Sequence, residues 1–319
     1  MKILFTSVGR RVELMQAFRK AAEELGVDLT IVGADITPSA PALYFCDETQ
    51  IVCKIREPEY IPQLLSICEI EKIDCLIPTI DTDLLLLAEN KAKFEAIGTK
   101  VLISAVDKVK LCRDKRFTAD YFISLGLKSP LPTDDVDKYT MGYPAFIKPK
   151  DGSSSVDAYK VNNESDLRTY AAKITDYIIQ PFISGREFTI DIFCDYQGNP
   201  VYITPRERLA VRAGEVLKTQ IYQDDVMIEE MKTLIADYKP CGEITVQLIQ
   251  DENTGDNYYI EINPRFGGGA PLSIKAGADS AKAVIRMLKG ETLVYEEKAA
   301  RDRATYSRFD QSICVDEGV

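Results

Sequence analysis

The sequence contains no histidine in its 319 residues. Histidine is the side chain that most often serves as a general base or a metal ligand near neutral pH. Its absence excludes serine–histidine hydrolases, histidine-ligated zinc hydrolases and histidine kinases. Any chemistry of this chain must therefore use carboxylates, amides, lysines, arginines and backbone groups.

Paired cysteines and long apolar runs are also missing. The eight cysteines are scattered and form no CxxC motif, so neither a zinc knuckle nor a redox pair is indicated, and we expect reduced, structural cysteines. The most apolar segments, such as LTIVGADI and DCLIPTI, have only the length of a strand, which is too short to span a bilayer. The N-terminus begins with a strand-like run and lacks the pattern of a secretion signal, so we expect a cytoplasmic protein with no membrane partner.

Basic residues are outnumbered by acidic ones. The 39 lysines and arginines against 50 aspartates and glutamates give a net charge of -11, which disfavours non-specific binding to nucleic acid or anionic membranes. An anionic ligand must then be bound by a local basic cluster. With 45% hydrophobic and 28% charged residues, the chain is typical of a globular α/β protein, and its length predicts two or three units that share a cleft.

The first hundred residues alternate strand-like and helix-like patterns. Strand-like runs begin at positions 2, 29 and 74, and helical patterns follow from 12, 61 and 83. This order predicts parallel strands joined by right-handed helical crossovers, as in an open doubly wound sheet. The turn after the first strand carries a single glycine rather than GxGxxG, so the pattern gives little support to a dinucleotide site.

A second unit is predicted after residue 107. Residues 106–127 have a helical pattern with Asp114 near a helix start, and the turn-rich stretch 128–142 indicates a linker. A hairpin, a helix and a strand follow, and then longer strands, a helix and a second hairpin. We therefore predict an α/β domain, a small lobe, a large lobe and a C-terminal tail, with the boundaries 1–107, 108–183, 184–295 and 296–319.

The second hairpin gathers oxygen donors on one face. ITVQLIQ (244–250) and YYIEIN (258–263) flank a segment of turn-forming residues. If the strands pair about Thr254, Gln247 faces Glu261. The alternation of side chains then places two sets on opposite faces: a core face with Val246, Leu248, Ile260 and Ile262, in which Leu248 faces Ile260 and Val246 faces Ile262, and a polar face with Gln247, Glu261 and Asn263.

The polar trio suits a hard divalent cation. Mg²⁺ prefers a few protein oxygens and fills its other positions with water and phosphate. The alternative is an ordinary solvated sheet face. The residues that follow Asn263 favour a binding site. Pro264 stops the strand, Arg265 adds a cation, and Gly267–Gly269 allow close backbone approach to a phosphate or substrate.

Two lysines and a loop add candidates for binding phosphate. Lys148 lies in AFIKP and Lys115 in CRDKRF, and both ammonium groups are suited to neutralising phosphate oxygens, although each alone fits a surface lysine. The loop DGSSS (151–155) offers backbone N–H groups and small hydroxyls. An ordinary hairpin turn is its alternative.

These segments, in this order, resemble the ATP-grasp superfamily, in particular the ATP-binding modules of carbamoyl-phosphate synthase large subunits and related carboxylate-amine ligases. The resemblance covers nearly the whole chain and rests on DK at 114–115, YPAFIKP, the serine-glycine loop, IIQPFISGREFTIDIF, and VQ followed 13 residues later by EINPR. It implies an α/β fold in which an N-terminal doubly wound parallel sheet, the pre-ATP-grasp domain, precedes a two-lobed ATP-grasp domain. It also implies ATP and Mg²⁺ as cofactors, with two ions and with Mn²⁺ as a substitute.

The resemblance also implies a role for each matching residue. Lys115 and Lys148 would hold the phosphates, and Arg265 would stabilise an acyl phosphate and the transition state that forms it. Glu187 would bind the ribose. The adenine would meet Gln180, Phe182 and Ile183; the loop over the phosphates would be Asp151, Gly152, Ser153, Ser154 and Ser155; and the metal ligands would be Gln247, Glu261 and Asn263.

The acceptor pocket has no shared motif. The stretch TPRERLAVRAGEVLK is locally basic, through Arg206, Arg208, Arg212 and Lys218, and arginine grips carboxylates with two N–H groups. We expect Arg212 to bind the acceptor. The alternative is an outward-facing strand of alternating charge.

Three functions are open at this point. The first is an ATP- and Mg-dependent ligase that joins a small carboxylic acid, such as an amino acid, to an amine or ammonia through an acyl phosphate, with ADP and phosphate as products. The second is a single-module, carbamoyl-phosphate-synthase-like subunit that phosphorylates bicarbonate or carbamate. The third is a non-catalytic ATP-binding regulatory protein. The expected partners are small molecules, with a homodimer through the N-terminal sheet as the assembly considered.

Overall fold

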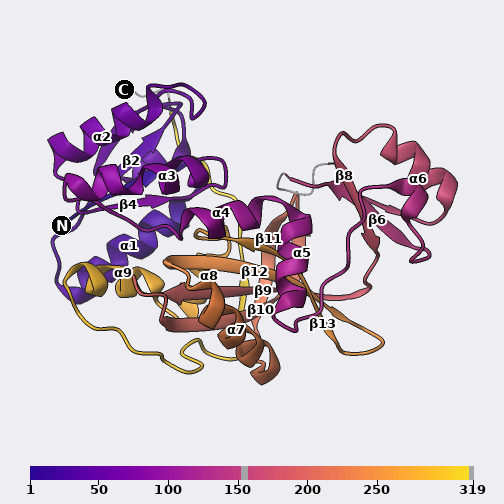
Figure 1. The fold of residues 1–319 in the computed structure, drawn as a ribbon. Helices are drawn as coiled ribbons and strands as arrows, with labels where there is room; N and C mark the ends of the chain where they lie inside the picture. The colour runs from indigo at the N-terminus through magenta and orange to yellow at the C-terminus, as the bar shows by residue number, and fades with distance from the viewer. Residues whose placement is uncertain (152–156, 316–319) are drawn as a thin grey trace.

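The computed structural model describes residues 1–151 and 157–315, which form three sheets (Figure 1). The first sheet lies at the N-terminus, on the left of Figure 1, and the smallest sheet stands apart on the right. The largest sheet lies between and below them. A parallel-sheet region followed by an antiparallel ATP-grasp-like region is the predicted fold class, which the structure confirms.

The N-terminal sheet is parallel, in the order β3-β2-β1-β4-β5. Its alternate residues face two cores: Ile3 and Phe5 of β1 pack with α1, whereas Leu4 packs with α2 and α3. Both faces are therefore covered, as a doubly wound sheet requires. The elements are β1 (Lys2–Thr6), α1 (Val12–Leu25), β2 (Thr30–Asp35), the 3₁₀ helix η1 (Pro41–Phe45), β3 (Glu48–Ile51), α2 (Tyr60–Glu71), β4 (Cys75–Pro78), α3 (Leu84–Ala96) and β5 (Lys100–Val101).

Two helices connect this sheet to the rest. They are α4 (Val106–Arg113) and α5 (Lys115–Ser124), and the Asp114 side chain caps α5 by accepting a hydrogen bond from the Arg116 N–H. The buried Phe122 of α5 packs on Tyr259 of the large sheet, with ring centroids 5.2 Å apart. Helix α5 therefore rests on the large sheet and directs its first residue, Lys115, toward the small one, where its N–H donates to the Lys150 carbonyl.

The small sheet is antiparallel, in the order β7-β6-β8. It contains β6 (Ala145–Pro149), β7 (Tyr159–Val161) and β8 (Tyr177–Pro181), with the helix α6 (Glu164–Ala171) and the short 3₁₀ helix η2 (Val136–Lys138) beside it. The predicted hairpin is confirmed, because Ala145 pairs with Val161. A small core that includes Ile147, Leu167 and Ile179 holds the helix to the sheet.

The large sheet is antiparallel, in the order β13-β12-β9-β10-β11-β14. Helix α7 packs on one face, and α8 and α9 share the other core with α1 of the N-terminal unit. The elements are β9 (Gly185–Cys194), β10 (Pro200–Arg212), β11 (Glu215–Ile221), α7 (Asp225–Tyr238), β12 (Gly242–Asp251), β13 (Asn257–Asn263), α8 (Ala270–Ala276), α9 (Ser280–Leu288) and β14 (Thr305–Ser307).

The segment after residue 296, expected as a tail, is packed in part. Strand β14 pairs with the edge of β11, and Ala300 and Ala304 are buried. Arg308 then forms an ion pair with Glu13 of α1 at 3.0 Å. The segment thus contributes a strand to the large sheet and ties it to the N-terminal unit.

Candidate active site

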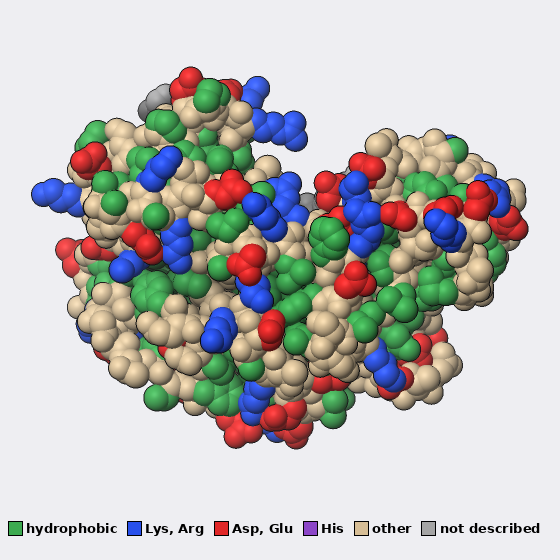
Figure 2. Space-filling model, viewed as in Figure 1, with side chains coloured by type: hydrophobic (Ala, Val, Ile, Leu, Met, Phe, Trp, Pro, Cys, Tyr) green, Lys and Arg blue, Asp and Glu red, His purple; other side chains and the backbone are tan. Residues whose placement is uncertain are grey.

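A cleft of about 530 Å³ lies where the three units meet. In the space-filling view the surface is hollowed between the N-terminal unit and the small-sheet unit, and charged side chains border the hollow (Figure 2). A second pocket of about 250 Å³ adjoins it and is lined in part by the same residues: Phe146, Lys148, Glu187, Ile249 and Ile260. The two form one groove with a charged part and a more apolar part.

The predicted polar face of the β12–β13 hairpin forms one wall of the cleft. Gln247 lies opposite Glu261, and the Asn263 amide donates to Glu261 at 2.9 Å. All three side chains line the cleft. They supply one carboxylate and two carboxamides, which are oxygen donors of the kind Mg²⁺ accepts. Among the described residues there is no group of three or more histidine, cysteine, aspartate or glutamate side chains placed to hold a metal.

The predicted register of the β12–β13 hairpin is wrong at Leu248. Gln247 pairs with Glu261, but Leu248 then pairs with Tyr259 rather than Ile260, so that Ile260 is an extra, bulged residue. Tyr259 takes the core position, fully buried, and its hydroxyl donates to Glu230 at 2.7 Å. Ile260 is turned out of the core and lines both pockets. The bulge thereby places an apolar side chain beside the polar trio.

Two lysines face the trio from other elements. Lys148 of β6 is only 7% exposed, and burial lowers the pKa of its ammonium group to about 8, although the Glu261 charge acts in the opposite direction. Burial also lowers the pKa of Lys115, again against the charge of Glu261. Both lysines line the cleft as predicted. The structure thus brings two cations and the Glu261 carboxylate to one place.

The predicted adenine segment borders the apolar pocket. Gln180 of β8 is buried and donates to the Pro130 carbonyl at 2.6 Å, and Phe182 and Ile183 follow it along the wall. The Phe182 N–H is already used, because it donates to the Pro144 carbonyl at 3.1 Å. Glu187, at the start of β9, lies on both pockets.

The predicted phosphate loop is described only at its first residue. Asp151 lines the cleft at the end of β6. Gly152, Ser153, Ser154 and Ser155 lie outside the described residues.

Arg265 links the hairpin to the N-terminal unit. Its guanidinium donates to Asp81 at 2.8 Å and to the Asn263 amide oxygen at 3.2 Å. Its buried Nε has no hydrogen-bond acceptor among the described residues. The chain places this cation immediately beyond the polar trio because Pro264 ends the strand pairing.

The three glycines after Arg265 lie close to other side chains of the protein. A Cβ on Gly267 would lie 2.7 Å from the Thr245 hydroxyl, one on Gly268 would collide with Glu215 and with Arg11, and one on Gly269 would lie 2.5 Å from the Arg206 guanidinium. The ligand platform expected from this loop stays a prediction. Their absent side chains let neighbouring charged groups approach the backbone.

The fold places the basic residues of the predicted acceptor stretch in different environments. Arg206 is buried in an ion pair with Asp191 at 2.8 Å, and Lys218 is exposed. Arg212 lies at the exposed end of β10, pairs with Asp310 at 3.0 Å and is not among the described residues that line the cleft. Of this set Arg208 lines the cleft. The placement of Arg212 at the acceptor is therefore corrected: the pairing of β10 with β11 is irregular between Arg208 and Val211, so Arg212 does not keep the face that Arg208 presents to the cleft.

Three charged residues of the cleft were not found from the sequence. They are Arg11, Asp81 and Glu215. Arg11 follows β1 and Asp81 follows β4, which are neighbours at the point where the strand order reverses. Carboxyl ends of parallel strands at such a point are a common place for ligand sites, and this was the available signal. Glu215, at the start of β11, had no comparable signal.

Two family models match the chain. Residues 3–102 match the PylC-like N-terminal domain, and residues 173–311 match the model described as ATP-grasp in the biosynthetic pathway with Ter operon. The two matched ranges correspond to the parallel-sheet unit and to most of the grasp region. Residues 173–311 thus match an ATP-grasp family model.

Comparisons with individual proteins agree with this fold. The carbamoyl phosphate synthase large chain of Thermotoga petrophila is 24% identical over 303 residues, which are 86% of this chain and 27% of that protein, so the chain spans about a quarter of its length. Biotin carboxylase from Campylobacter jejuni superposes with a TM-score of 0.74 at 19% identity, over 95% of this chain and 74% of that chain. L-amino acid ligase from Bacillus licheniformis superposes with a TM-score of 0.71 at 19% identity, over 95% of this chain and 78% of that chain.

Among the helices of the described residues, none has both the length and the apolar character needed to cross a membrane.

Proposed function

We propose that this protein is an ATP- and Mg-dependent carboxylate-amine ligase that forms an acyl phosphate. The observation that carries the proposal is the juxtaposition of the polar trio, Gln247, Glu261 and Asn263, with the buried Lys148 across one cleft. A lysine with a pKa lowered by burial needs an anion to hold its charge there, and the nucleotide phosphates supply one. The match of residues 173–311 to an ATP-grasp family model supports the same conclusion.

The nucleotide is assigned to the groove as a whole. The apolar pocket beside Phe146, Ile249 and Ile260 suits the adenine, with Gln180 and the backbone of residues 182–183 at its edge. Glu187, between the pockets, suits the ribose. Lys115 and Lys148 would then hold the phosphates, together with the predicted loop 151–155, of which Asp151 is described and lines the cleft, and this arrangement orders the nucleotide from one pocket to the other.

The polar trio would hold Mg²⁺, with two ions in the complete site and Mn²⁺ as a substitute. The fit rests on the donors, which are carboxylate and amide oxygens on one sheet face. Bound Mg²⁺ supplies neutralisation of the phosphate charge.

The reaction would proceed in two balanced steps. An oxygen of the acceptor carboxylate attacks the γ-phosphorus, and the bond to the β–γ bridging oxygen breaks, releasing ADP. An amine then attacks the acyl carbon, loses a proton and displaces phosphate. Lys115, Lys148 and Arg265 would lie beside the γ-phosphoryl group and stabilise its negative charge during transfer. This step therefore needs no histidine.

One assay tests this function. ADP release from Mg-ATP is measured against a panel of amino acids and against bicarbonate, each with and without ammonia. Turnover that depends on a carboxylic acid and requires an amine supports the ligase. Tight nucleotide binding with no turnover on the whole panel would overturn it in favour of a regulatory ATP-binding protein.

A second candidate is a carbamoyl-phosphate-synthase-like subunit that phosphorylates bicarbonate or carbamate. The match to the synthase large chain favours it, although this chain spans about a quarter of that protein. Bicarbonate-dependent turnover without an added carboxylic acid would select it.

We further propose the four segments 1–107, 108–183, 184–295 and 296–319 as the units of the chain, a cytoplasmic location and a homodimer through the N-terminal sheet. The eight cysteines are unpaired, which supports a reducing compartment. Light scattering at several protein concentrations tests the dimer.

A further inference from the structure

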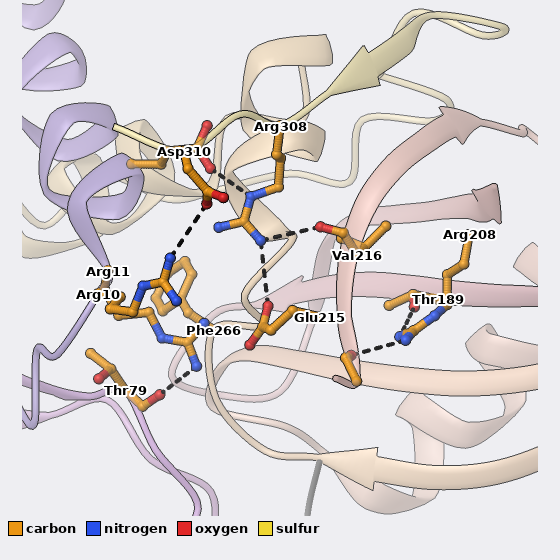
Figure 3. Close-up of polar contacts among 12 residues, drawn as sticks. Arg10, Arg11, Thr79, Thr189, Arg208, Glu215, Val216, Phe266, Arg308 and Asp310 are labelled. Atoms are coloured by element: carbon orange, nitrogen blue, oxygen red, sulfur yellow. Dashed lines mark hydrogen bonds and ion pairs between the residues drawn. The ribbon is translucent and has the colours of Figure 1, made fainter. Parts of the chain in front are cut away.

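Three arginines from different elements line the cleft beside the polar trio. They are Arg11 from the β1–α1 turn, Arg208 from β10 and Arg265 after β13, and the carboxylate of Glu215 lies with them. We call this set the arginine end of the cleft. Figure 3 shows Arg11, Arg208 and Glu215 on elements that face one another.

Arg11 is held in place on one side only. Its Nη2 donates to the Thr79 carbonyl at 3.2 Å, and its Nη1 lies against Gly268, which can approach only because it lacks a side chain. The adjacent Arg10 turns away toward Asp310, at 3.5 Å, with 83% of its side chain exposed (Figure 3). Two successive arginines thus have different environments, one in the cleft and one on the surface.

Arg265 keeps an unpaired N–H group inside the protein, whereas Arg208 is paired. The buried Nε of Arg265 has no hydrogen-bond acceptor among the described residues, and the Nε of Arg208 forms an ion pair with Glu187 at 3.4 Å. The Arg208 side chain is 9% exposed, and its other nitrogens donate to Gly214 at 3.0 Å and to Thr189 at 3.5 Å. A buried donor without an acceptor is unfavourable, so an oxygen-bearing ligand at this end would be stabilised.

Glu215 adds a second negative charge to this end, besides Asp81, which forms an ion pair with Arg265 at 2.8 Å. Its carboxylate lies against Gly268, as the Arg11 guanidinium does, and forms an ion pair with Arg308 at 3.4 Å. Arg308 is itself held by Glu13 of α1. About half of the Glu215 side chain, 55%, is exposed, so one side of the carboxylate faces the cleft.

This combination distinguishes between classes of acceptor. A purely anionic acceptor would be attracted by the arginines but repelled by Glu215. A zwitterion uses both, because its carboxylate meets the guanidinium groups and its ammonium group meets Glu215.

We propose that the arginine end binds an α-amino acid, with its carboxylate at Arg11 and Arg265 and its ammonium group at Glu215. This inference rests on the proposed ligase function and specifies its substrate. Arg11 and Glu215 are then specificity residues, and Arg265 is shared with the phosphoryl transfer. The placement also puts the amino acid carboxylate next to the polar trio, where the γ-phosphate would arrive.

The test compares Arg11→Gln and Glu215→Gln with the control Arg10→Gln. ADP release is measured with each of the 20 proteinogenic L-amino acids and with their deamino analogues, in the presence of Mg-ATP and ammonia. We expect Arg11→Gln to raise the KM for the amino acid by about tenfold, with the KM for ATP changed less than about twofold, and the control to match the wild type. Glu215→Gln should remove most of the preference for the amino acid over its deamino analogue.

Failure of this inference differs from failure of the ligase function. Turnover that requires bicarbonate alone, and is unchanged in Arg11→Gln, would overturn the amino acid site while leaving phosphoryl transfer intact. Thermal melting with Mg²⁺ and a non-hydrolysable ATP analogue supplies a second measurement. If the analogue raises the melting temperature but no amino acid raises it further or supports turnover, the amino acid site is also overturned. If the analogue does not raise the melting temperature, ATP binding itself is overturned. If Arg11→Gln does not fold, Arg11→Lys keeps the charge without the two-pronged geometry and should show a smaller rise in the same KM.

Discussion

Gln247 on β12 lies directly opposite Glu261 on β13, one residue before the bulge that turns Ile260 into the cleft. The pair depends on two different constraints. Strand alternation places both side chains on the same face, and the bulge allows Tyr259 to fill the core without moving Glu261 from that face. The cleft wall therefore combines a polar patch, which suits the proposed metal and phosphates, with an apolar side chain, which suits the proposed adenine.

Glu261→Gln should reduce turnover by about a hundredfold, because an amide is nearly the same size but brings no charge to a metal or to the two lysines. The matched control is Glu252→Gln, an exposed acid in the turn of the same hairpin, which should leave turnover unchanged. The measurement is ADP release under saturating Mg-ATP. Equal turnover in both variants would contradict the assigned metal site.

Lys148→Met should raise the melting temperature of the nucleotide-free protein at pH 7 and weaken ATP binding. Burial lowers the Lys148 pKa in the folded protein to about 8 from 10.5, so the charged form is disfavoured by folding. This destabilisation is fully present below pH 8 and disappears as the pH rises toward 10.5, so the difference between variant and wild type should shrink over that window. Melting curves from pH 7 to 10, with and without nucleotide, measure both effects. A melting temperature that falls equally at every pH would contradict the account.

Asp83→Asn should stabilise the protein at pH 7.5 and lose that advantage in acid. Asp83 is fully buried beside the ends of β1 and β4, where it accepts hydrogen bonds from Thr6 at 2.9 Å and Tyr60 at 3.1 Å. Burial raises its carboxyl pKa from 3.8 to about 6, so the destabilising charged form dominates above pH 6 and the wild type gains stability as the pH falls toward 3.8. Denaturant unfolding at pH 7.5 and pH 4.5 compares the two proteins. A variant that is less stable at pH 7.5 would show that the charged hydrogen bonds outweigh the burial.

Arg208→Gln and Arg212→Gln should separate the site arginine from the surface arginine. The first removes a cleft cation and should raise the acceptor KM by about tenfold, whereas the second removes an exposed pair with Asp310 and should change it by less than about twofold. The two variants carry the same substitution on one strand, so each controls for the other. Steady-state kinetics with a fixed ATP concentration measure the difference. A larger effect from Arg212 would restore the acceptor role that the sequence suggested.

The sequence by itself determined the local patterns of this protein. Continuous apolar runs specify the parallel strands of the first hundred residues, strand patterns beside turn residues specify both hairpins, and the spacing of Gln247, Glu261 and Asn263 puts them on one face. These features depend on the period of a strand or helix, which a single segment contains. The family resemblance added the lysines, whose side chains the structure also brings to the cleft.

Only the tertiary structure decided which distant residues meet there. Arg11 and Asp81 reach the cleft because β1 and β4 are neighbours in the sheet, and Arg212 pairs with Asp310 on the surface, beyond an irregularity in the pairing of β10 with β11. The bulge at Ile260 follows from the packing of Tyr259 with Phe122 and Glu230, which are residues of other elements. A strand's own sequence sets the alternation of its side chains, but the partners that displace that alternation are set by the packing of the whole chain.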